Sequence, residues 1–157
     1  MSDIMISEIL HRSAEVKNKM ISFCAGPAEQ AAQMIATSMR KGGKLMLCGN
    51  GGSAGDAQHL AAEFVAALDH AKPCLALPAL PLTTDTSFLT AYANDFGFEG
   101  FFARQVEALG HAGDVLVGIS TSSNSKNVLA AAKTAKDNQI SAIPFTGEIG
   151  GQMADLT

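Results

Sequence analysis

Apolar residues near the start of the chain recur at steps of three, four and seven, which is the spacing of one helix face. This pattern predicts a helix over residues 3–23 and a second helix over residues 27–41, after an interruption at Gly26-Pro27. The apolar positions are Ile6, Ile9, Leu10, Val16, Met20 and Phe23 in the first helix and Ala28, Ala31, Ala32, Ile35 and Met39 in the second. Together these faces exceed what one small sheet needs for cover. They predict either a subunit interface or ordinary core helices.

Short apolar runs alternate with helical patterns in the rest of the chain. The clearest strand is the β-branched run 114–120, which lies between Gly113 and a polar loop. Further strands are predicted at 45–48, 80–83 and 140–145, and helices at 56–68, 86–93, 101–109 and 127–137. Pro81 makes the second strand irregular, because proline donates no ladder hydrogen bond. The alternation predicts an α/β fold: a parallel sheet with right-handed crossovers and helices on both faces.

Composition supports one domain spanning residues 1–157. Hydrophobic residues make up 47% of the chain and charged ones 17%, which argues against disorder. A formal net charge of −4 gives no basic footprint, so we expect neither nucleic acid nor a membrane as a partner. The chain has three cysteines without CxxC spacing, no basic and apolar leader, and no run of about 18 apolar residues. These features predict a cytoplasmic protein.

The first predicted strand ends in a glycine-rich loop, Gly49-Asn50-Gly51-Gly52-Ser53, and an alanine-rich helical pattern follows it. Glycines let the backbone approach a ligand, and the first turn of a helix offers free N–H groups and the positive end of its dipole. The loop therefore predicts an anion site. It lacks the lysine of a Walker motif and fits the dinucleotide fingerprint only loosely, with Asp69 as a weak ribose candidate.

A second polar loop, Ser120-Thr121-Ser122-Ser123-Asn124-Ser125, lies between the clearest strand and a predicted helix. Its five hydroxyls and one amide can surround the oxygens of a phosphate without a cationic side chain. The alternative is a helix cap with spare polar residues, since serine and asparagine favour caps and turns. The density of hydroxyls favours the phosphate site.

His59 and Glu63 are four residues apart in a predicted helix, so they lie about one turn from each other on the same face. The pair can share one metal ion, or Glu63 can act as a general base beside a substrate. A solvated surface pair is the alternative, and it is the commoner explanation of this spacing taken by itself. Two ligands do not complete a tetrahedral site, and the spacing of Asp56, His70 and His111 nominates none of them as a third.

Several motifs together resemble the phosphoheptose isomerase family of the sugar-isomerase (SIS) domain superfamily. In chain order they are Cys48-Gly49-Asn50-Gly51-Gly52-Ser53, Asp56-Ala57-Gln58-His59, Glu63, Leu82-Thr83-Thr84-Asp85-Thr86-Ser87, Asn94-Asp95-Phe96-Gly97-Phe98, Arg104-Gln105-Val106-Glu107-Ala108-Leu109-Gly110 and Gly118-Ile119-Ser120-Thr121-Ser122. The resemblance extends from the first helices to the turn at Thr146-Gly147 and Gly150-Gly151. It implies a SIS-type, flavodoxin-like three-layer fold with N-terminal helices for oligomerisation.

The resemblance also implies an activity: conversion of sedoheptulose 7-phosphate to D-glycero-D-manno-heptose 7-phosphate, for lipopolysaccharide or other envelope glycans. Glu63 would be the catalytic acid/base, and His59 and Glu63 would be ligands of one zinc ion. Contacts with the substrate are implied for Asn50, Gly51, Gly52, Glu63, Asn94 and Asp95 at the sugar, and for Ser120, Thr121, Ser122 and Ser125 at the phosphate. A homotetramer with active sites at subunit boundaries is implied as well.

The chain departs from the family pattern in three ways. Ser123 stands where the family has glycine, so a left-handed backbone there would cost roughly 1 to 2 kcal/mol through its Cβ. Pro81 and Pro144 stand at strand positions. The chain ends at Thr157, whereas the family continues into a strand and a helix whose Gln and His complete the metal site and supply a second acid/base group. We therefore expect the 157-residue form to bind sugar phosphate with weak or absent activity.

Two alternatives to an isomerase remain open. One is a non-catalytic SIS protein that binds the bacterial replication initiator, and the other is a module that only binds sugar phosphates. The presence of Glu63 argues against the first, because a pure interaction protein is expected to have lost this carboxylate. The lack of a fused second domain argues against the second.

Overall fold

The computed structural model describes residues 3–68, 71–72, 75–147 and 150–156. The chain divides into two compact units, Met1–Met34 and Ile35–Thr157, and we describe each by itself. The single domain over residues 1–157 stays a prediction. Among the described residues, no helix is both long and apolar enough to cross a membrane.

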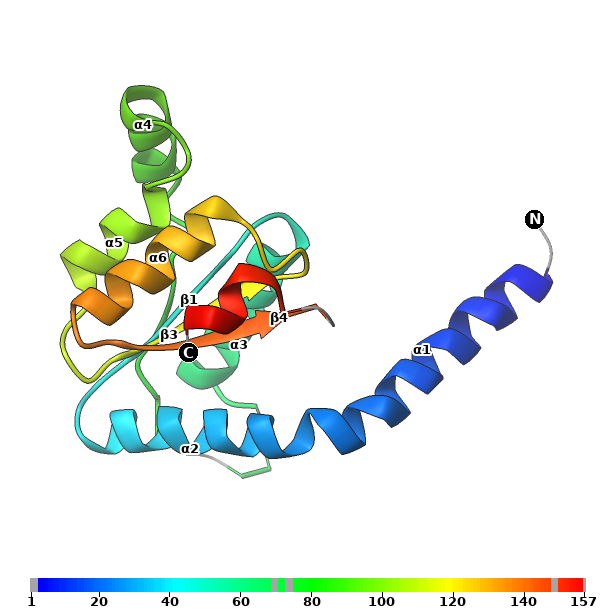
Figure 1. Cartoon of the computed structure of the whole chain (residues 1–157). Helices are drawn as coiled ribbons and strands as arrows, with labels where there is room; N and C mark the ends of the chain where they lie inside the picture. Colours follow the sequence, from blue (N-terminus) through cyan, green and yellow to red (C-terminus); the bar gives the residue numbers. More distant parts are fainter. Residues whose placement is uncertain (1–2, 69–70, 73–74, 148–149, 157) are drawn as a thin grey trace. The chain divides into compact units, whose positions relative to one another are not determined.

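Two long helices occupy the start of the chain (Figure 1). α1 spans Asp3–Phe23 and α2 spans Ala25–Arg40, so both predicted helices are confirmed and the second begins two residues early. Pro27 lies in the first turn of α2, where a missing N–H leaves no helix hydrogen bond unmade. Apolar side chains of α1 are exposed, among them Leu10 at 65% and Phe23 at 76%. The subunit interface stays a prediction.

Four parallel strands form the sheet of the second unit, in the order β2-β1-β3-β4. Three of them, β1, β3 and β4, are labelled in Figure 1. β1 spans Leu45–Gly49, β2 spans Ala79–Pro81, β3 spans Val115–Ser120 and β4 spans Ser141–Thr146. The predicted parallel sheet is therefore confirmed. Pro81 and Pro144 lie in β2 and β4, the two outer strands of the described sheet, so neither removes a hydrogen bond between the inner strands.

The helices after β1 follow the predicted order. α3 spans Gly52–Val65, α4 spans Thr86–Phe96, α5 spans Phe101–Leu109, α6 spans Lys126–Asp137, and the 3₁₀-helix η1 spans Gly151–Leu156. The bounds of α5 are those predicted, whereas α4 runs three residues further and α6 begins one residue earlier. The apolar pattern does not predict η1, which is too short to show a period.

The prediction for α3 is wrong at both ends. The helix begins at Gly52, four residues early, because Gly51 turns the chain with a φ of +55° that glycine adopts readily. It ends at Val65, three residues early. The carbonyl of Phe64 accepts from the N–H of Leu77 at 3.0 Å, so the approach to β2 uses an acceptor that a longer helix would need.

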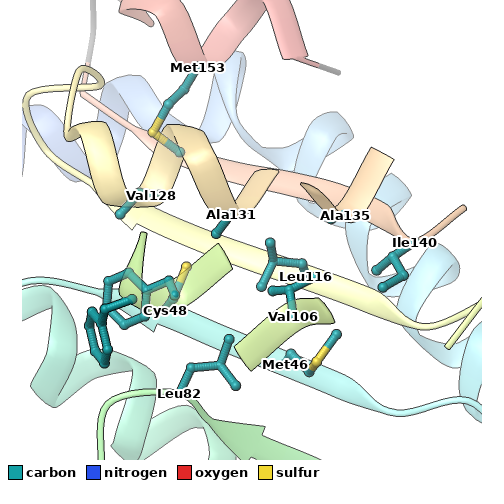
Figure 2. Packing of buried hydrophobic residues seen from close by; sticks show 12 residues of the cluster. Met46, Cys48, Leu82, Val106, Leu116, Val128, Ala131, Ala135, Ile140 and Met153 are labelled. Carbon is teal, nitrogen blue, oxygen red and sulfur yellow. The ribbon is translucent and has the colours of Figure 1, made fainter. Parts of the chain in front are cut away.

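Side chains of β1 and β3 alternate between the two faces of the sheet. On one face, Met46 and Cys48 of β1 pack with Leu116 of β3 against α5 and α6 (Figure 2). The remaining buried residues of this core are Leu82, Phe101, Phe102, Val106, Val128, Ala131, Ala135, Ile140 and Met153. On the other face, α3 packs on β1 and β2 and buries Ala57 and Ala61. The predicted helices on both faces are therefore confirmed.

A polar cluster joins the amino ends of β1 and β3, and we call its three residues, Lys44, His111 and Asp114, the amino-edge clamp. The buried Asp114 carboxylate accepts from the backbone N–H groups of Lys44 at 2.9 Å and His111 at 2.8 Å, and it pairs with the Lys44 ammonium. Burial alone would raise the pKa of the Asp114 carboxyl. The hydrogen bonds from Lys44 and His111 and the charge of Lys44 outweigh burial, so the pKa is lowered.

Candidate active site

Between β1 and β3, the direction in which the chain adds successive strands to the sheet reverses. The carboxyl ends of these two strands therefore form the topological switch point. The chain passes from β1 to β2 on one side, whereas it passes from β3 to β4 on the other side. Ligands of open parallel sheets bind in the crevice at such a switch point. Two loops meet there: the glycine loop, residues 49–53, and the hydroxyl loop, residues 120–125.

A reciprocal pair of hydrogen bonds connects the glycine loop to the helix that follows the hydroxyl loop. The side-chain nitrogen of Asn50 donates to the side-chain oxygen of Asn127 at 2.9 Å, and the nitrogen of Asn127 donates to the oxygen of Asn50 at 2.9 Å. Asn127 lies buried in the first turn of α6, and Asn50 is half-buried. Sequence reasoning missed Asn127, because no local pattern reveals a partner 77 residues away.

Close packing explains the glycines of the first loop. A Cβ on Gly49 would lie 2.8 Å from the backbone oxygen of Ser53, so the loop folds tightly onto the start of α3. Gly51 has a positive φ, and a Cβ on Gly52 would meet nothing within 4 Å. The predicted junction of strand, glycine loop and helix N-terminus is confirmed, and it leaves open space beside the first turn of α3.

The hydroxyls of the second loop bond to one another. Ser120 Oγ lies 2.9 Å from Ser125 Oγ and 3.3 Å from Ser122 Oγ, and Thr121 is exposed beside them. Ser125 is the N-cap residue of α6, yet its side chain makes no capping hydrogen bond. A helix cap with spare polar residues therefore does not account for Ser125. The hydroxyls converge, as a phosphate site requires.

Ser123 adopts the left-handed backbone whose cost was anticipated for this position. Its φ is +58°, and the residue is 2% exposed. η1 supports the turn: the Met153 N–H donates to the Ser123 carbonyl at 3.3 Å, and the Gln152 N–H donates to Asn124 Oδ1 at 3.2 Å. The conformation of the hydroxyl loop is therefore stabilised by hydrogen bonds from η1 as well as by hydrogen bonds within the loop.

His59 and Glu63 form the predicted pair on α3. His59 Nε2 lies 3.6 Å from Glu63 Oε1, and the two side chains are 76% and 29% exposed. Two ligand atoms about 2 Å from a tetrahedral zinc lie roughly 3.4 Å apart, so this spacing suits two ligands of one ion. In the part of the chain that the structure describes, no three His, Cys, Asp or Glu residues form a metal-binding group. The pair by itself does not close a site.

The His59–Glu63 pair lies away from the two loops. Gln58 Nε2 donates to Thr83 Oγ1 after β2 at 3.2 Å, whereas the carbonyl of Phe64 accepts from Leu77 before β2. α3 therefore runs from the carboxyl ends of the strands back toward their amino ends. Glu63 lies eleven residues after the start of α3, which corresponds to about 16 Å along a helix. Along α3, Glu63 is therefore displaced from the glycine loop toward the amino ends of the strands.

Asn94 and Asp95 lie near the end of α4 and bond to each other, with Asn94 Nδ2 donating to Asp95 Oδ1 at 2.8 Å. Both side chains are exposed. Asp95 also lines an open hollow of about 500 Å³ between α4 and α5, together with Phe88, Ala91, Tyr92, Phe96, Arg104 and Glu107. The candidate residues thus form three groups in one chain: the two loops, the α3 pair and the α4 pair.

Other polar residues do not join these groups. Burial raises the pKa of the Cys48 thiol to about 12, so this cysteine is not a nucleophile. His111 belongs to the amino-edge clamp, where its Nδ1 lies 3.2 Å from Lys44 Nζ. Asp69, the weak ribose candidate, and His70 lie outside the described residues.

A doubly wound parallel sheet with a glycine loop and a hydroxyl loop at its switch point is the arrangement of a sugar-isomerase domain. The family model of the SIS domain matches residues 9–147. This match covers both loops, the His59–Glu63 pair and the Asn94–Asp95 pair, and it defines the class to which the protein belongs.

Relatives narrow the class to one family. The chain is 49% identical over 151 residues to the phosphoheptose isomerase of Roseiflexus sp. (strain RS-1), with 96% of this chain and 75% of the relative covered. It is 58% identical over 135 residues to that of Desulfovibrio desulfuricans, with 82% and 63% covered. A solved phosphoheptose isomerase from Neisseria gonorrhoeae superimposes with a TM-score of 0.90 at 44% identity, over 96% of this chain and 78% of that one. The chain belongs to the phosphoheptose isomerase family.

Proposed function

We propose that this protein converts sedoheptulose 7-phosphate to D-glycero-D-manno-heptose 7-phosphate. The observation that carries the proposal is the convergence of the Ser120, Ser122 and Ser125 hydroxyls at the switch point, in a chain of the phosphoheptose isomerase family. The relatives compared above are named as isomerases. They give no support to the alternative of a protein that binds the replication initiator.

The two loops would hold the two ends of the substrate. The hydroxyl loop donates hydrogen bonds to the phosphate oxygens, and the positive end of the α6 dipole favours the phosphate charge. Asn50 and the backbone of Gly51 and Gly52 contact the sugar hydroxyls from the neighbouring loop. Asn94 and Asp95 provide further polar contacts to the sugar. Positive charge is not needed, because oriented O–H and N–H groups bind the anion.

Glu63 would move the proton. Its carboxylate removes a proton from C1 of the ketose while the C2 carbonyl oxygen gains one, which gives an enediol. Glu63 then returns its proton to C2. The C1 hydroxyl releases one proton as C1 becomes the aldehyde, and this proton replaces the one that the C2 oxygen gained. The atoms balance without an oxidant or reductant, and a positioned carboxylate contributes about 10²- to 10⁴-fold to such a step.

We further propose that His59 and Glu63 hold a zinc ion, which is supported by their donor types and their 3.6 Å spacing. A bound zinc would polarise oxygens of the sugar. Elemental analysis of the purified protein tests this proposal. Equal zinc contents in the unsubstituted protein and His59→Ala would contradict it.

A homotetramer with sites between subunits is proposed for two reasons. Seven bonds separate C2 from phosphorus in the substrate, a span of roughly 8 Å when extended, whereas Glu63 lies about 16 Å along α3 from the glycine loop at the start of that helix. The exposed apolar face of α1 offers a surface for assembly. Sedimentation of the purified protein checks the assembly, and a monomer at all concentrations would contradict it.

Glu63→Gln tests the reaction. We expect the rate of aldose formation from sedoheptulose 7-phosphate to fall by about 10²- to 10⁴-fold, with binding of the sugar phosphate retained. Glu29→Gln is the matched control, because Glu29 is exposed on α2 and glutamine keeps the oxygen that accepts from Gln33. Equal rates of aldose formation in Glu63→Gln and in the unsubstituted protein would contradict the proposed role of Glu63.

The place of the reaction is proposed on chemical grounds. Its product supplies heptose for envelope glycans such as lipopolysaccharide. Cys24 and Cys48 are free, which fits the reducing cytoplasm. Fractionation of cells that express the protein checks this location, and recovery outside the cytoplasmic fraction would contradict it.

A further inference from the structure

Asn127 is a buried polar side chain to which the proposed reaction gives no role. It is 4% exposed and lies in the first turn of α6, two residues after the N-cap Ser125. Burying an amide is unfavourable unless its donors and acceptors are paired. The hydrogen bonds of Asn127 therefore explain why this amide is tolerated in a buried position. They also show that it fixes the orientation of the Asn50 side chain.

The orientation of the Asn127 amide is fixed by the backbone. The Val128 N–H donates to Asn127 Oδ1 at 3.0 Å, so this atom must be the acceptor oxygen and not the NH₂ group. The same oxygen accepts from Asn50 Nδ2, which uses both of its lone pairs. Asn127 Nδ2 must then face Asn50 Oδ1, where the distance is 2.9 Å.

This constraint passes to Asn50. The reciprocal pair uses one N–H and one lone pair of the Asn50 amide, so one N–H and one lone pair remain at this half-buried side chain. Turning the Asn50 amide over would set donor against donor and acceptor against acceptor. The direction in which Asn50 presents its remaining donor and acceptor is therefore dictated by Val128 through Asn127.

We infer that Asn127 is a positioning residue: it orients the Asn50 amide toward the sugar and holds the glycine loop at a set distance from the hydroxyl loop. The inference rests on the proposed function, since Asn50 is taken as a contact of the sugar. Asn127 is 4% exposed, and in this inference it acts through Asn50. Its effect should appear in binding of the sugar and not in binding of phosphate alone.

Asn127→Asp is the sharpest test, because the two side chains have nearly the same shape. The aspartate keeps an oxygen for the Val128 N–H, and a negative charge is favourable in the first turn of a helix, so the protein should fold. Its second oxygen, however, faces Asn50 Oδ1. Both atoms are acceptors, so the hydrogen bond between the two side chains is lost at this point. The added charge also weakens phosphate binding at the start of α6, so inorganic phosphate serves as the reference. We expect the loss of affinity for sedoheptulose 7-phosphate to exceed the loss for inorganic phosphate by about tenfold.

Asn138→Asp is the matched control, since Asn138 is exposed at the other end of α6. It should change neither affinity. A double-substitution cycle with Asn50→Ala then separates positioning from a general structural role. If Asn127 acts through Asn50, adding Asn127→Asp to Asn50→Ala should weaken sugar phosphate binding no more than it weakens binding of inorganic phosphate.

The outcomes distinguish this inference from the proposed function. Equal loss of phosphate and sugar phosphate affinity in Asn127→Asp overturns the positioning role and leaves the isomerase proposal standing. A further loss in the double variant that is specific to the sugar phosphate does the same. Failure of the unsubstituted protein to bind sedoheptulose 7-phosphate overturns the proposed function, and this inference falls with it. Unchanged affinity in Asn127→Asp overturns the inference alone.

Discussion

The two edges of the sheet use polar groups in different ways. At the amino edge, the Asp114 carboxylate is surrounded by donors from Lys44 and His111, and the Ser38 hydroxyl donates to the Gly113 carbonyl at 2.6 Å. At the carboxyl edge, the hydroxyls of the second loop bond chiefly to one another. A hydroxyl can donate and accept, so such a group can turn to a ligand. The polar groups of the amino edge thus stabilise the fold, whereas the hydroxyls of the carboxyl edge can still bind a ligand.

Replacing the clamp carboxylate should have the largest effect on stability. In Asp114→Asn, the amide nitrogen would face the N–H of His111 or the Lys44 groups, which are all donors. We expect the free energy of unfolding to fall by about 2 to 3 kcal/mol, which is less than the cost of breaking a fully buried ion pair because Lys44 is partly exposed. Urea unfolding measures this loss, and phosphate affinity should be unchanged.

The same variant carries a pH signature. Because the folded state lowers the pKa of Asp114, the clamp stabilises the protein above the ordinary aspartate pKa of about 3.9 and loses this contribution as the pH falls through the lower folded value. The stability difference between the unsubstituted protein and Asp114→Asn should therefore shrink below about pH 4. The control is Asp137→Asn, at the exposed end of α6. A difference that stays constant with pH would show that the clamp does not act through ionisation.

Removing a hydroxyl from the carboxyl edge should weaken ligand binding and leave stability unchanged, which is the reverse of the effect expected for Asp114→Asn. Ser125→Ala deletes a partner of Ser120 but no capping bond. We expect inorganic phosphate and sugar phosphate to bind about tenfold more weakly, with the free energy of unfolding unchanged within about 0.5 kcal/mol. Calorimetry and urea unfolding measure the two quantities.

Ser141→Ala is the control for this variant, because Ser141 is exposed at the start of β4 on the amino edge. It should change neither quantity. If Ser125→Ala instead lost about 1 kcal/mol of stability and kept its affinity, Ser125 would be a helix cap and the distinction between the edges would weaken.

The smallest expected effect concerns strained backbone, which occurs at both edges. Ser123 in the hydroxyl loop has φ +58°, and Gln139, before β4, has φ +59°. Ser123→Gly and Gln139→Gly should each raise the free energy of unfolding by about 0.5 to 1 kcal/mol, since relief of the Cβ strain exceeds the entropy that glycine adds to the unfolded chain. Thermal unfolding compares them.

Phosphate affinity should not change in either glycine variant. A loss of affinity confined to Ser123→Gly would show that the Ser123 side chain takes part in binding. Equal stabilisation by the Ser123 and Gln139 substitutions would show that left-handed backbone strain occurs at both edges and does not by itself identify the carboxyl edge as the binding edge.

The apolar periodicity along the chain predicts much of the fold. The β-branched run that became β3 and the period of α5 were readable because strand and helix periods depend on neighbouring residues. The ends of α3 were not readable, because they depend on the backbone of Gly51 and on the bond from Leu77 to Phe64. η1 was also missed, although it buries Met153 in the core.

By itself, the sequence determined the parallel α/β order, the glycine and hydroxyl loops, and the His59–Glu63 pair, because each depends on residues close together in the chain. The pairing of Asn50 with Asn127, and the clamp of Lys44 and Asp114, which are 70 residues apart, came from the three-dimensional fold alone. These relations arise from the approach of distant segments, for which a single sequence carries no periodic signal.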